Sequence, residues 1–247
     1  MNPFSLTGKT ILVTGASSGI GRATAISCSQ MGATLIITAR NEPRLSETFR
    51  MLEGHHHVQI CADLIIQDEL DTLIEQLPKL DGIVNVAGIA KPLVLSLTDK
   101  EDVNEILQIN MLVPIHLTRL VLQNKKLNKG ASLIYISSIN GNNCAYIGSS
   151  VYAASKSALN GFMKAVALEL APRGIRANCI NPGMIDTDLL NSGSIGQEEL
   201  EKDRMKYPLK RYGKPEEVAN AVVYLLSDAT KWMTGSSLLL DGGYTLQ

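Results

Sequence analysis

Residues 10–26 read TILVTGASSGIGRATAI, and this stretch decides the fold. The apolar run Thr10–Val13 predicts a buried strand, residues 14–21 predict a tight turn, and the segment from Arg22 onward predicts a helix. Glycines in such a turn let the backbone approach a pyrophosphate, and the opening helix directs free N–H groups and the positive end of its dipole at it. An ordinary strand-to-helix connection is the alternative for a glycine-rich turn taken alone.

Six more β-branched runs follow, with helical segments between most of them: Thr34–Thr38, Val58–Cys61, Gly82–Val86, Ser132–Ser137, Arg176–Ile180 and Ser237–Leu240. This alternation predicts an α/β fold, a doubly wound parallel sheet of about seven strands with helices on both faces. No internal repeat or linker-like stretch divides the chain, so we expect one domain over residues 1–247. Ligands of such sheets bind beyond the carboxyl ends of the strands.

The composition suits this fold, since hydrophobic residues make up 45% and aromatic residues only 4% of the chain. A formal net charge of −1 offers no general attraction to nucleic acid. No apolar run reaches the roughly eighteen residues that span a bilayer, and Met1–Ser5 lacks a secretory pattern, so we expect no membrane partner and a cytoplasmic location. The four cysteines are widely spaced, and the side chains of His55–His57 diverge, so we predict no metal site.

Tyr152 and Lys156 stand four residues apart, on one face of a helix. A phenol with a pKa of about 10 is a poor acid-base group at neutral pH, but a neighbouring cation favours the phenolate and lowers that pKa. The pair suits proton donation to a carbonyl. An isolated pair with this spacing is usually a solvated helix face, so the assignment depends on the rest of the chain.

Along essentially its full length, the sequence resembles the short-chain dehydrogenase/reductase family. The matching motifs are the T-G-x-x-x-G-x-G turn at 14–21, N-x-A-G at Asn85–Gly88, the helix asparagine Asn110, the strand-end serine Ser138, Y-x-x-x-K at Tyr152 and Lys156, Pro182–Gly183 with Thr187, and Leu240–Gly243. The pattern is most similar to the 3-oxoacyl-acyl-carrier-protein reductases and the carbonyl, sugar and steroid dehydrogenases close to them. The resemblance implies a Rossmann-type fold and hydride transfer between a nicotinamide cofactor and a carbonyl or secondary alcohol.

The resemblance also implies four catalytic residues: Asn110, Ser138, Tyr152 and Lys156. Tyr152 would exchange a proton with the substrate oxygen, and Ser138 would hydrogen-bond that oxygen. Lys156 would lower the pKa of Tyr152 and bind the nicotinamide ribose. Ser137 is the rival of Ser138, which we prefer because the serine of the family comes second in the pair.

Pro114 has no N–H, so a helix through this position leaves the carbonyl of Asn110 without its usual donor. The resemblance implies a proton-relay water beside Lys156, held by this asparagine. We expect Pro114 to help open the acceptor, and a packing kink is the alternative.

Arg40 follows the second strand at the place where NAD-binding proteins carry an acid. A carboxylate would repel a 2′-phosphate, whereas a guanidinium binds it, so we expect NADP(H) rather than NAD(H), with Arg44 as a second cation. A surface arginine without a ligand is the alternative, and Ser18 stands where some NADP-preferring relatives carry a basic residue. The expected cofactor-binding residues are Gly15, Ser17, Ser18, Gly19, Ile20, Gly21, Arg40, Asp63, Leu64, Asn85, Ala87, Gly88, Tyr152, Lys156, Pro182, Gly183, Ile185 and Thr187.

Residues 184–212 correspond to the substrate lid of the family. Their mixed composition leaves open both a small polar carbonyl and an acyl chain. Lys125, Lys126, Lys129 and Arg173 stand where acyl-carrier-protein reductases carry cations for their acidic partner, which favours an acyl-carrier protein as partner only weakly.

Three functions remain open: an NADPH-dependent reductase of 3-oxoacyl thioesters, a dehydrogenase of sugar, polyol or steroid alcohols, and a non-catalytic NADP-binding sensor. The intact acid-base residues argue against the sensor. The apolar faces of Met111–Leu122 and Ala153–Leu170 predict helix pairing in a homotetramer, with a dimer as the alternative.

Overall fold

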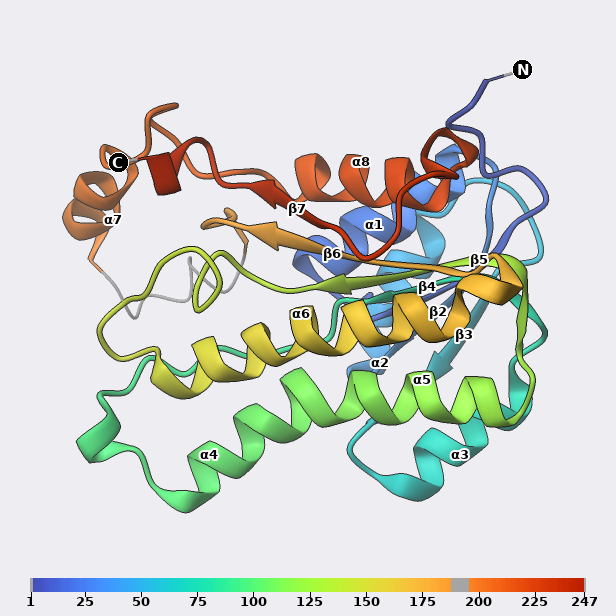
Figure 1. Ribbon diagram of the computed structural model, residues 1–247, viewed down its shortest axis with the longest axis horizontal. Helices are drawn as coiled ribbons and strands as arrows, with labels where there is room; N and C mark the ends of the chain where they lie inside the picture. The colour runs from blue at the N-terminus through green and yellow to red at the C-terminus, as the bar shows by residue number, and fades with distance from the viewer. Residues whose placement is uncertain (1, 188–195, 247) are drawn as a thin grey trace.

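The computed structural model describes residues 2–187 and 196–246 (Figure 1). Its strands are β1 (Thr10–Thr14), β2 (Thr34–Ala39), β3 (Val58–Cys61), β4 (Leu80–Asn85), β5 (Leu127–Ile136), β6 (Arg176–Pro182) and β7 (Ser237–Leu240). Its α-helices are α1 (Gly19–Gln30), α2 (Glu42–Arg50), α3 (Gln67–Gln76), α4 (Lys100–Leu107), α5 (Val113–Gln123), α6 (Ser150–Leu170), α7 (Gln197–Arg204) and α8 (Pro215–Leu226). A π-helical turn, η2 (Gln108–Leu112), joins α4 to α5.

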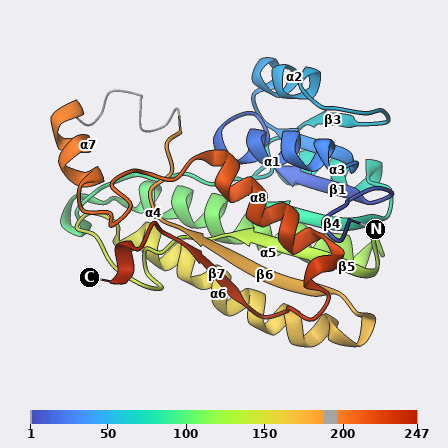
Figure 2. The same ribbon diagram turned by 90° about the horizontal axis from the view of Figure 1, so that it is seen from above.

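The seven strands form one parallel sheet in the order β3-β2-β1-β4-β5-β6-β7. Helices α1, α2 and α8 cover one face, and α3, α5 and α6 cover the other (Figures 1 and 2). Each face buries its own aliphatic core, with Ile37 and Val222 in one and Leu133 and Met163 in the other. Strands buried on both faces read as continuous apolar runs, so the predicted doubly wound fold is confirmed.

All seven predicted runs are strands, and the largest error lies at the start of β5. This strand begins at Leu127 rather than at Ser132, because Leu80 pairs with Leu127 while Gly82 pairs with Ser132. The register shift places an irregularity in β5 near Gly130, whose φ is +77°. Exposed polar residues in this part of the strand interrupt the apolar pattern from which strands are predicted.

Helices α4 and α5 run together with η2 as one helical stretch, Lys100–Gln123. By length and composition this stretch could cross a membrane, but half of its most apolar part is buried inside the protein. Ile109, Val113 and Leu117 are among the side chains that it buries. We therefore interpret it as a helix that packs against the sheet.

Strands β2 and β4 flank β1 on opposite sides. From β1 the chain first adds β2 and β3 on one side of β1, and then adds β4 on its other side. This reversal of strand order makes a topological switch point at the carboxyl end of β1. Segments that follow β1 to β6 all emerge at this edge of the sheet. The fold therefore brings the sequence-predicted residues to one end of the molecule.

Candidate active site

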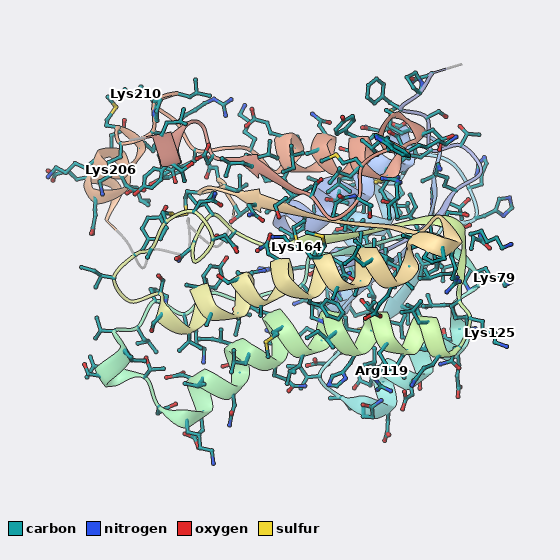
Figure 3. All side chains as sticks on the ribbon, viewed as in Figure 1. Lys79, Arg119, Lys125, Lys164, Lys206 and Lys210 are labelled. Atoms are coloured by element: carbon teal, nitrogen blue, oxygen red, sulfur yellow. The ribbon has the colours of Figure 1, made fainter. Side chains whose placement is uncertain are left out.

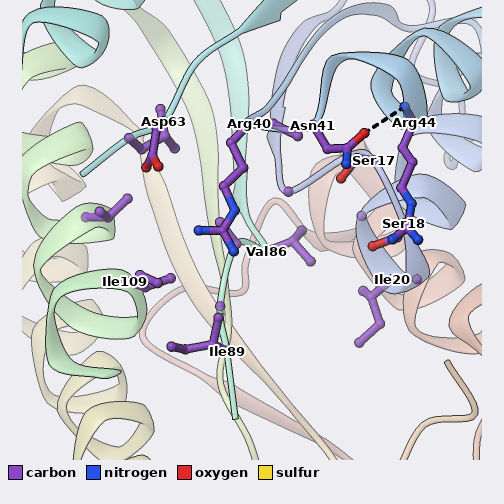
Figure 4. Close-up of a pocket in the computed structure, with 18 of the residues that line it drawn as sticks. Ser17, Ser18, Ile20, Arg40, Asn41, Arg44, Asp63, Val86, Ile89 and Ile109 are labelled. Atoms are coloured by element: carbon purple, nitrogen blue, oxygen red, sulfur yellow. Dashed lines mark hydrogen bonds between the residues drawn. The ribbon is translucent and has the colours of Figure 1, made fainter. Parts of the chain in front are cut away.

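A cavity of about 440 Å³ opens at the carboxyl ends of β1, β2, β3 and β4 (Figure 4). Most of the predicted cofactor-binding residues line it: Gly15, Ser17, Ser18, Gly19, Ile20, Gly21, Arg40, Asp63, Leu64, Ala87, Gly88 and Thr187. Its volume and its mixed apolar and polar lining are typical of a ligand site.

The turn between β1 and α1 has room for glycine alone at two positions. Gly15 has a φ of +65°, and a Cβ added to it would lie 2.9 Å from the main-chain nitrogen of Ala87. A Cβ on Gly21 would overlap the carbonyl of Gly15. Helix α1 starts directly after Ser18, whose side chain makes no capping hydrogen bond. The first N–H groups of α1 are therefore available to an anion such as a phosphate.

Two cations, Arg40 and Arg44, line this cavity. In Figure 4 the side chain of Arg40 extends over Val86 toward Ile89, and Arg44 lies beside Ser18. Within residues 2–187 and 196–246, neither guanidinium has a hydrogen-bond or ion-pair partner. Arg22 differs, since it binds Glu47 at 3.1 Å. The cavity thus holds two uncommitted positive charges, which suits an anionic group larger than the pyrophosphate alone.

The predicted proton donor lies at the amino end of α6. The Tyr152 side chain is hydrogen-bonded to that of Ser138, which follows the end of β5. Ser137 instead points toward the body of α6, where its Oγ donates to the carbonyl of Lys156 at 2.8 Å. Of the two serines, only Ser138 contacts the phenol. The Tyr152 and Ser138 side chains therefore lie close enough to act on one substrate atom, and their catalytic roles stay predictions.

Lys156 and Asn110 lie side by side at Gly88. A Cβ added to Gly88 would be 3.0 Å from Asn110 Oδ1 and 3.2 Å from Lys156 Nζ, so a larger residue here would displace both. Lys156 Nζ donates to the carbonyl of Ile136 at 2.9 Å. The Asn110 side chain exchanges two hydrogen bonds with the main chain of Ile89, at 2.8 and 2.9 Å. The segment after β4 thus locks the asparagine next to the lysine.

Burial dominates the electrostatics of this site. It raises the pKa of the Tyr152 phenol, and the hydrogen bond from Ser138 opposes that rise only in part. It also lowers the pKa of Lys156 to about 8. The expectation that the Tyr152 pKa lies below its ordinary value is wrong for this structure, because desolvation of the phenolate is the largest influence on it.

The helix around Asn110 widens into a π-turn. The N–H of Val113 donates to the carbonyl of Gln108, five residues back, immediately before Pro114 removes the next regular donor. Single π-turns inside α-helices are frequent at functional sites. That Pro114 leaves the Asn110 carbonyl free stays a prediction. The π-turn is the distortion of the helix that the structure shows beside Pro114.

Six predicted cofactor residues do not line the main cavity: Asn85, Tyr152, Lys156, Pro182, Gly183 and Ile185. Asn85 points sideways, because its Nδ2 donates to the carbonyl of Ile134 on β5, although its Oδ1 is buried without a partner among the described residues. Pro182 ends β6, and Gly183 packs against Tyr207 and Asp241. Ile185 lines a smaller neighbouring cavity of about 190 Å³. Asn85 therefore does not line this cavity, and its predicted contact with a cofactor stays a prediction.

Sequence reasoning missed several lining residues: Ala39, Asn41, Ala62, Ile65, Val86, Ile89, Ile109 and Val113. Most of them directly follow or flank a predicted strand end, which is the signal that could have identified them. Ile109 and Val113 carried no such signal, because they come from a helix that only tertiary packing brings to the cavity.

The predicted lid, residues 184–212, is described only in part, since residues 188–195 lie outside the described residues. In the second half of this segment, α7 is followed by Tyr207, whose hydroxyl accepts the N–H of Met184 at 3.1 Å. This contact joins the two described ends of the segment beside the site.

The four cations assigned to an acyl-carrier partner lie at the opposite end of the sheet from the cavity. Figure 3 shows Lys125 at this far end, with Lys206 and Lys210 at the other. Lys126 Nζ donates to the carbonyls of Glu75 and Leu77, and Arg173 donates to the carbonyl of Leu127. Within one protomer these cations cannot guide a partner into the site, because the connections before β5 and β6 lie at the amino ends of the strands.

Residues 15–245 match the family model described as Enoyl-(Acyl carrier protein) reductase. The chain is 37% identical over 240 residues to 3-oxoacyl-[acyl-carrier-protein] reductase FabG of Rickettsia felis, covering 97% of this chain and 98% of the relative. It is 35% identical over 242 residues to carbonyl reductase family member 4 of Xenopus tropicalis, covering 97% and 99% of the two chains. A solved structure of a short-chain dehydrogenase/reductase from Serratia marcescens has a TM-score of 0.89 and 30% identity, covering 97% and 99%.

Proposed function

The chain belongs to the short-chain dehydrogenase/reductase family, and from this premise we propose that it is an NADP(H)-dependent carbonyl reductase whose substrate is a 3-oxoacyl thioester. The observation that carries the proposal is the contact of the Tyr152 and Ser138 hydroxyls, with Lys156 and Asn110 at Gly88, which lines the neighbouring cavity. Two converging hydroxyls suit an oxygen on which negative charge develops.

The chemistry of the proposed mechanism is divided between cofactor and protein. The nicotinamide, when bound, supplies or accepts the hydride. Tyr152 gives its proton to the substrate oxygen during reduction and takes it back in the reverse direction. Ser138 donates a hydrogen bond to the same oxygen. Lys156 holds positive charge beside the phenol, and Asn110, which Ile89 fixes in place, holds the proton-relay position next to Lys156.

The preference for NADP(H) rests on the two unpaired guanidinium groups in the cavity. Arg40 and Arg44 would bind the 2′-phosphate, and the N–H groups at the start of α1 would bind the pyrophosphate. The cradle at Gly15 and Gly21 fits such a group, since a side chain at either position would fill it. Asp63 on the neighbouring strand end would lie near the adenine.

We also propose a cytoplasmic homotetramer, with helix pairing through the faces Met111–Leu122, on η2 and α5, and Ala153–Leu170, on α6. Leu168 on α6 is 79% exposed, which supports an interface on this face. A light-scattering mass near that of one 26.7 kDa chain at micromolar concentration would refute the assembly. An acyl-carrier protein as partner would need cations from a neighbouring subunit, because Lys125, Lys126, Lys129 and Arg173 lie far from the cavity of their own protomer.

The proposal is tested by the oxidation of NADPH and NADH with acetoacetyl thioesters of coenzyme A and of acyl-carrier protein. NADPH-dependent turnover that Tyr152→Phe abolishes and the remote Tyr224→Phe leaves unchanged would support the reaction class and the proton donor. A much lower KM for the carrier-protein thioester would support that partner.

The same assay separates the competing functions. Turnover of crotonyl thioesters but not of acetoacetyl thioesters would refute carbonyl reduction, because it would assign the hydride to a carbon–carbon double bond. NADP⁺ reduction by a sugar, polyol or steroid alcohol, without thioester turnover, would replace the proposed substrate class. Tight NADPH binding without turnover of any substrate would favour a sensor.

A further inference from the structure

Lys156 is held to the end of β5 by two hydrogen bonds. Its Nζ donates to the carbonyl of Ile136 at 2.9 Å, and its own carbonyl accepts the hydroxyl of Ser137 at 2.8 Å. Ile136, Ser137 and Ser138 are consecutive, so the residue that ties down Lys156 is the immediate neighbour of the serine in the site. The relative position of α6 and the end of β5 therefore determines how Lys156, Tyr152 and Ser138 meet.

A series of side-chain hydrogen bonds extends from the buried Ser137 to the exposed Ser237. Asn160, one turn beyond Lys156 on α6, donates from Nδ2 to Ser137 Oγ at 2.7 Å. Asn160 Oδ1 accepts the hydroxyl of Ser237 on the edge strand β7 at 2.6 Å. The hydrogen bonds thus run in series: Ser237 donates to Asn160, Asn160 donates to Ser137, and Ser137 donates to the Lys156 carbonyl. Such an arrangement lets successive hydrogen bonds strengthen one another.

A further hydrogen bond connects this series to Ser138. Asn142 Nδ2 donates to the carbonyl of Ser138 at 3.2 Å and lies 3.4 Å from Ser137 Oγ. Ser137 and Asn160 are only 3% and 7% exposed, and each would leave a buried partner unsatisfied if it were removed. An aliphatic pair would fill the same space between α6 and the sheet, but it would not define a distance between their backbones as hydrogen bonds do.

We propose that Ser137 and Asn160 are positioning residues, which set the distance between the end of β5 and the Tyr152–Lys156 turn of α6 and so hold Ser138, Tyr152 and Lys156 in register. The inference rests on the proposed function for its catalytic readout. Neither side chain contacts the cavity, so both act through the residues that they hold.

The central experiment compares Ser137→Ala with Ser132→Ala. Ser132 lies on the same strand, is 1% exposed, and donates to the carbonyl of Leu225 at 2.9 Å. Each variant removes a buried hydroxyl that donates to a helix carbonyl, and Ser137 Oγ in addition accepts from Asn160 and Asn142. A merely structural role predicts a loss of stability in each variant but no specific loss of kcat in Ser137→Ala. We expect kcat for acetoacetyl thioester reduction to fall by about tenfold to a hundredfold in Ser137→Ala only. KM and the NADPH dissociation constant should change little, and Ser137→Thr should restore kcat.

A second readout needs no substrate. The ε-carbon of Lys156, followed by ¹³C NMR and assigned with Lys156→Met, reports the titration of its ammonium. The titratable groups that face it are Tyr152 on its own helix and Cys179 on β6. Loosening of α6 would admit water, so the pKa of Lys156 should rise from about 8 toward its ordinary 10.5 in Ser137→Ala and Asn160→Leu, but not in Ser132→Ala.

The outcomes separate this inference from the proposed function. Equal kcat values and equal Lys156 titrations in Ser137→Ala and Ser132→Ala would overturn the inference. A wild type without thioester turnover would refute the proposed substrate, and the NMR titration would then decide the inference alone. If Ser137→Ala does not fold, the exposed Ser237→Ala removes the outermost bond of the series. A smaller change in the same two readouts would support the positioning role, and no change would overturn it.

Discussion

Replacing the buried Lys156 by methionine should stabilise the protein while abolishing its activity. The side chain is 5% exposed, and burial lowers its pKa from 10.5 to about 8. At roughly 1.4 kcal/mol for each pKa unit, the folded state at neutral pH carries a penalty of about 3 kcal/mol for the charged ammonium. Methionine removes this penalty and fills a similar volume.

The gain is reduced by one lost hydrogen bond. Lys156 Nζ donates to the carbonyl of Ile136, and loss of such a donor costs about 1 kcal/mol. We therefore expect a net gain of about 2 kcal/mol in the free energy of unfolding of Lys156→Met at pH 7. For a chain of this size that gain corresponds to a rise in Tm of about 4 to 8 °C.

The gain should depend on pH in a defined direction. Because the folded-state pKa of Lys156 is lowered, the unfolded state binds more protons between pH 8 and 10.5, and the stability of the wild type rises through this window. The advantage of Lys156→Met should thus be complete below pH 8 and disappear as the pH approaches 10.5. Urea unfolding at fixed protein concentration from pH 6 to pH 10 measures the difference.

Lys164→Met is the matched control, since Lys164 is an exposed lysine on the same helix. It should change stability by less than about 0.5 kcal/mol at every pH. The reasoning is refuted if Lys156→Met is less stable than the wild type at pH 7, or if its gain at pH 10 equals that at pH 7.

Three further perturbations test the cofactor site and the core. Arg40→Asp should lower the ratio of kcat/KM for NADPH to that for NADH by about tenfold to a hundredfold, because a charge-assisted hydrogen bond is replaced by repulsion; an unchanged ratio in steady-state kinetics would contradict the role of Arg40. Gly21→Ala should weaken NADPH binding by at least about tenfold, since its Cβ would collide with the carbonyl of Gly15. Fluorescence titration measures this loss, and wild-type affinity would show that the turn has another conformation. Tyr135→Phe should cost about 1 kcal/mol in urea unfolding, because the buried Tyr135 hydroxyl pairs with Thr118 Oγ1 at 3.0 Å, and should leave kcat unchanged.

The local sequence pattern predicted those parts of the site that depend on the backbone. The turn at Gly15 and Gly21 needs glycine for reasons of conformation and close approach, and both reasons can be read from a single chain. The sequence also predicted that Ser138 and Tyr152 act on one substrate oxygen, and the structure brings the two side chains into contact.

Errors arose where the outcome depends on packing. The pKa of Tyr152 is raised rather than lowered, since desolvation depends on how many atoms surround the phenol. Asn85 was expected in the cavity but bonds to a neighbouring strand, and strand register decides which way such a side chain points. The charge of Lys125 can be read from the sequence, and this residue was expected to meet an acyl-carrier partner. It lies at the end of the sheet opposite the cavity, because it precedes β5 and so stands at the amino end of that strand.

The sequence by itself determined the order of strands and helices along the chain, the phosphate-type turn and the candidate acid-base residues, because hydrophobic period, glycine conformation and side-chain chemistry are local properties. Only the tertiary structure decided which residues share the cavity, how far burial moves the pKa values of Tyr152 and Lys156, and that Ser137 and Asn160 join three elements behind them. These properties arise from atoms distant in the chain, and a hydrogen bond or a desolvated charge exists only once those atoms are packed together.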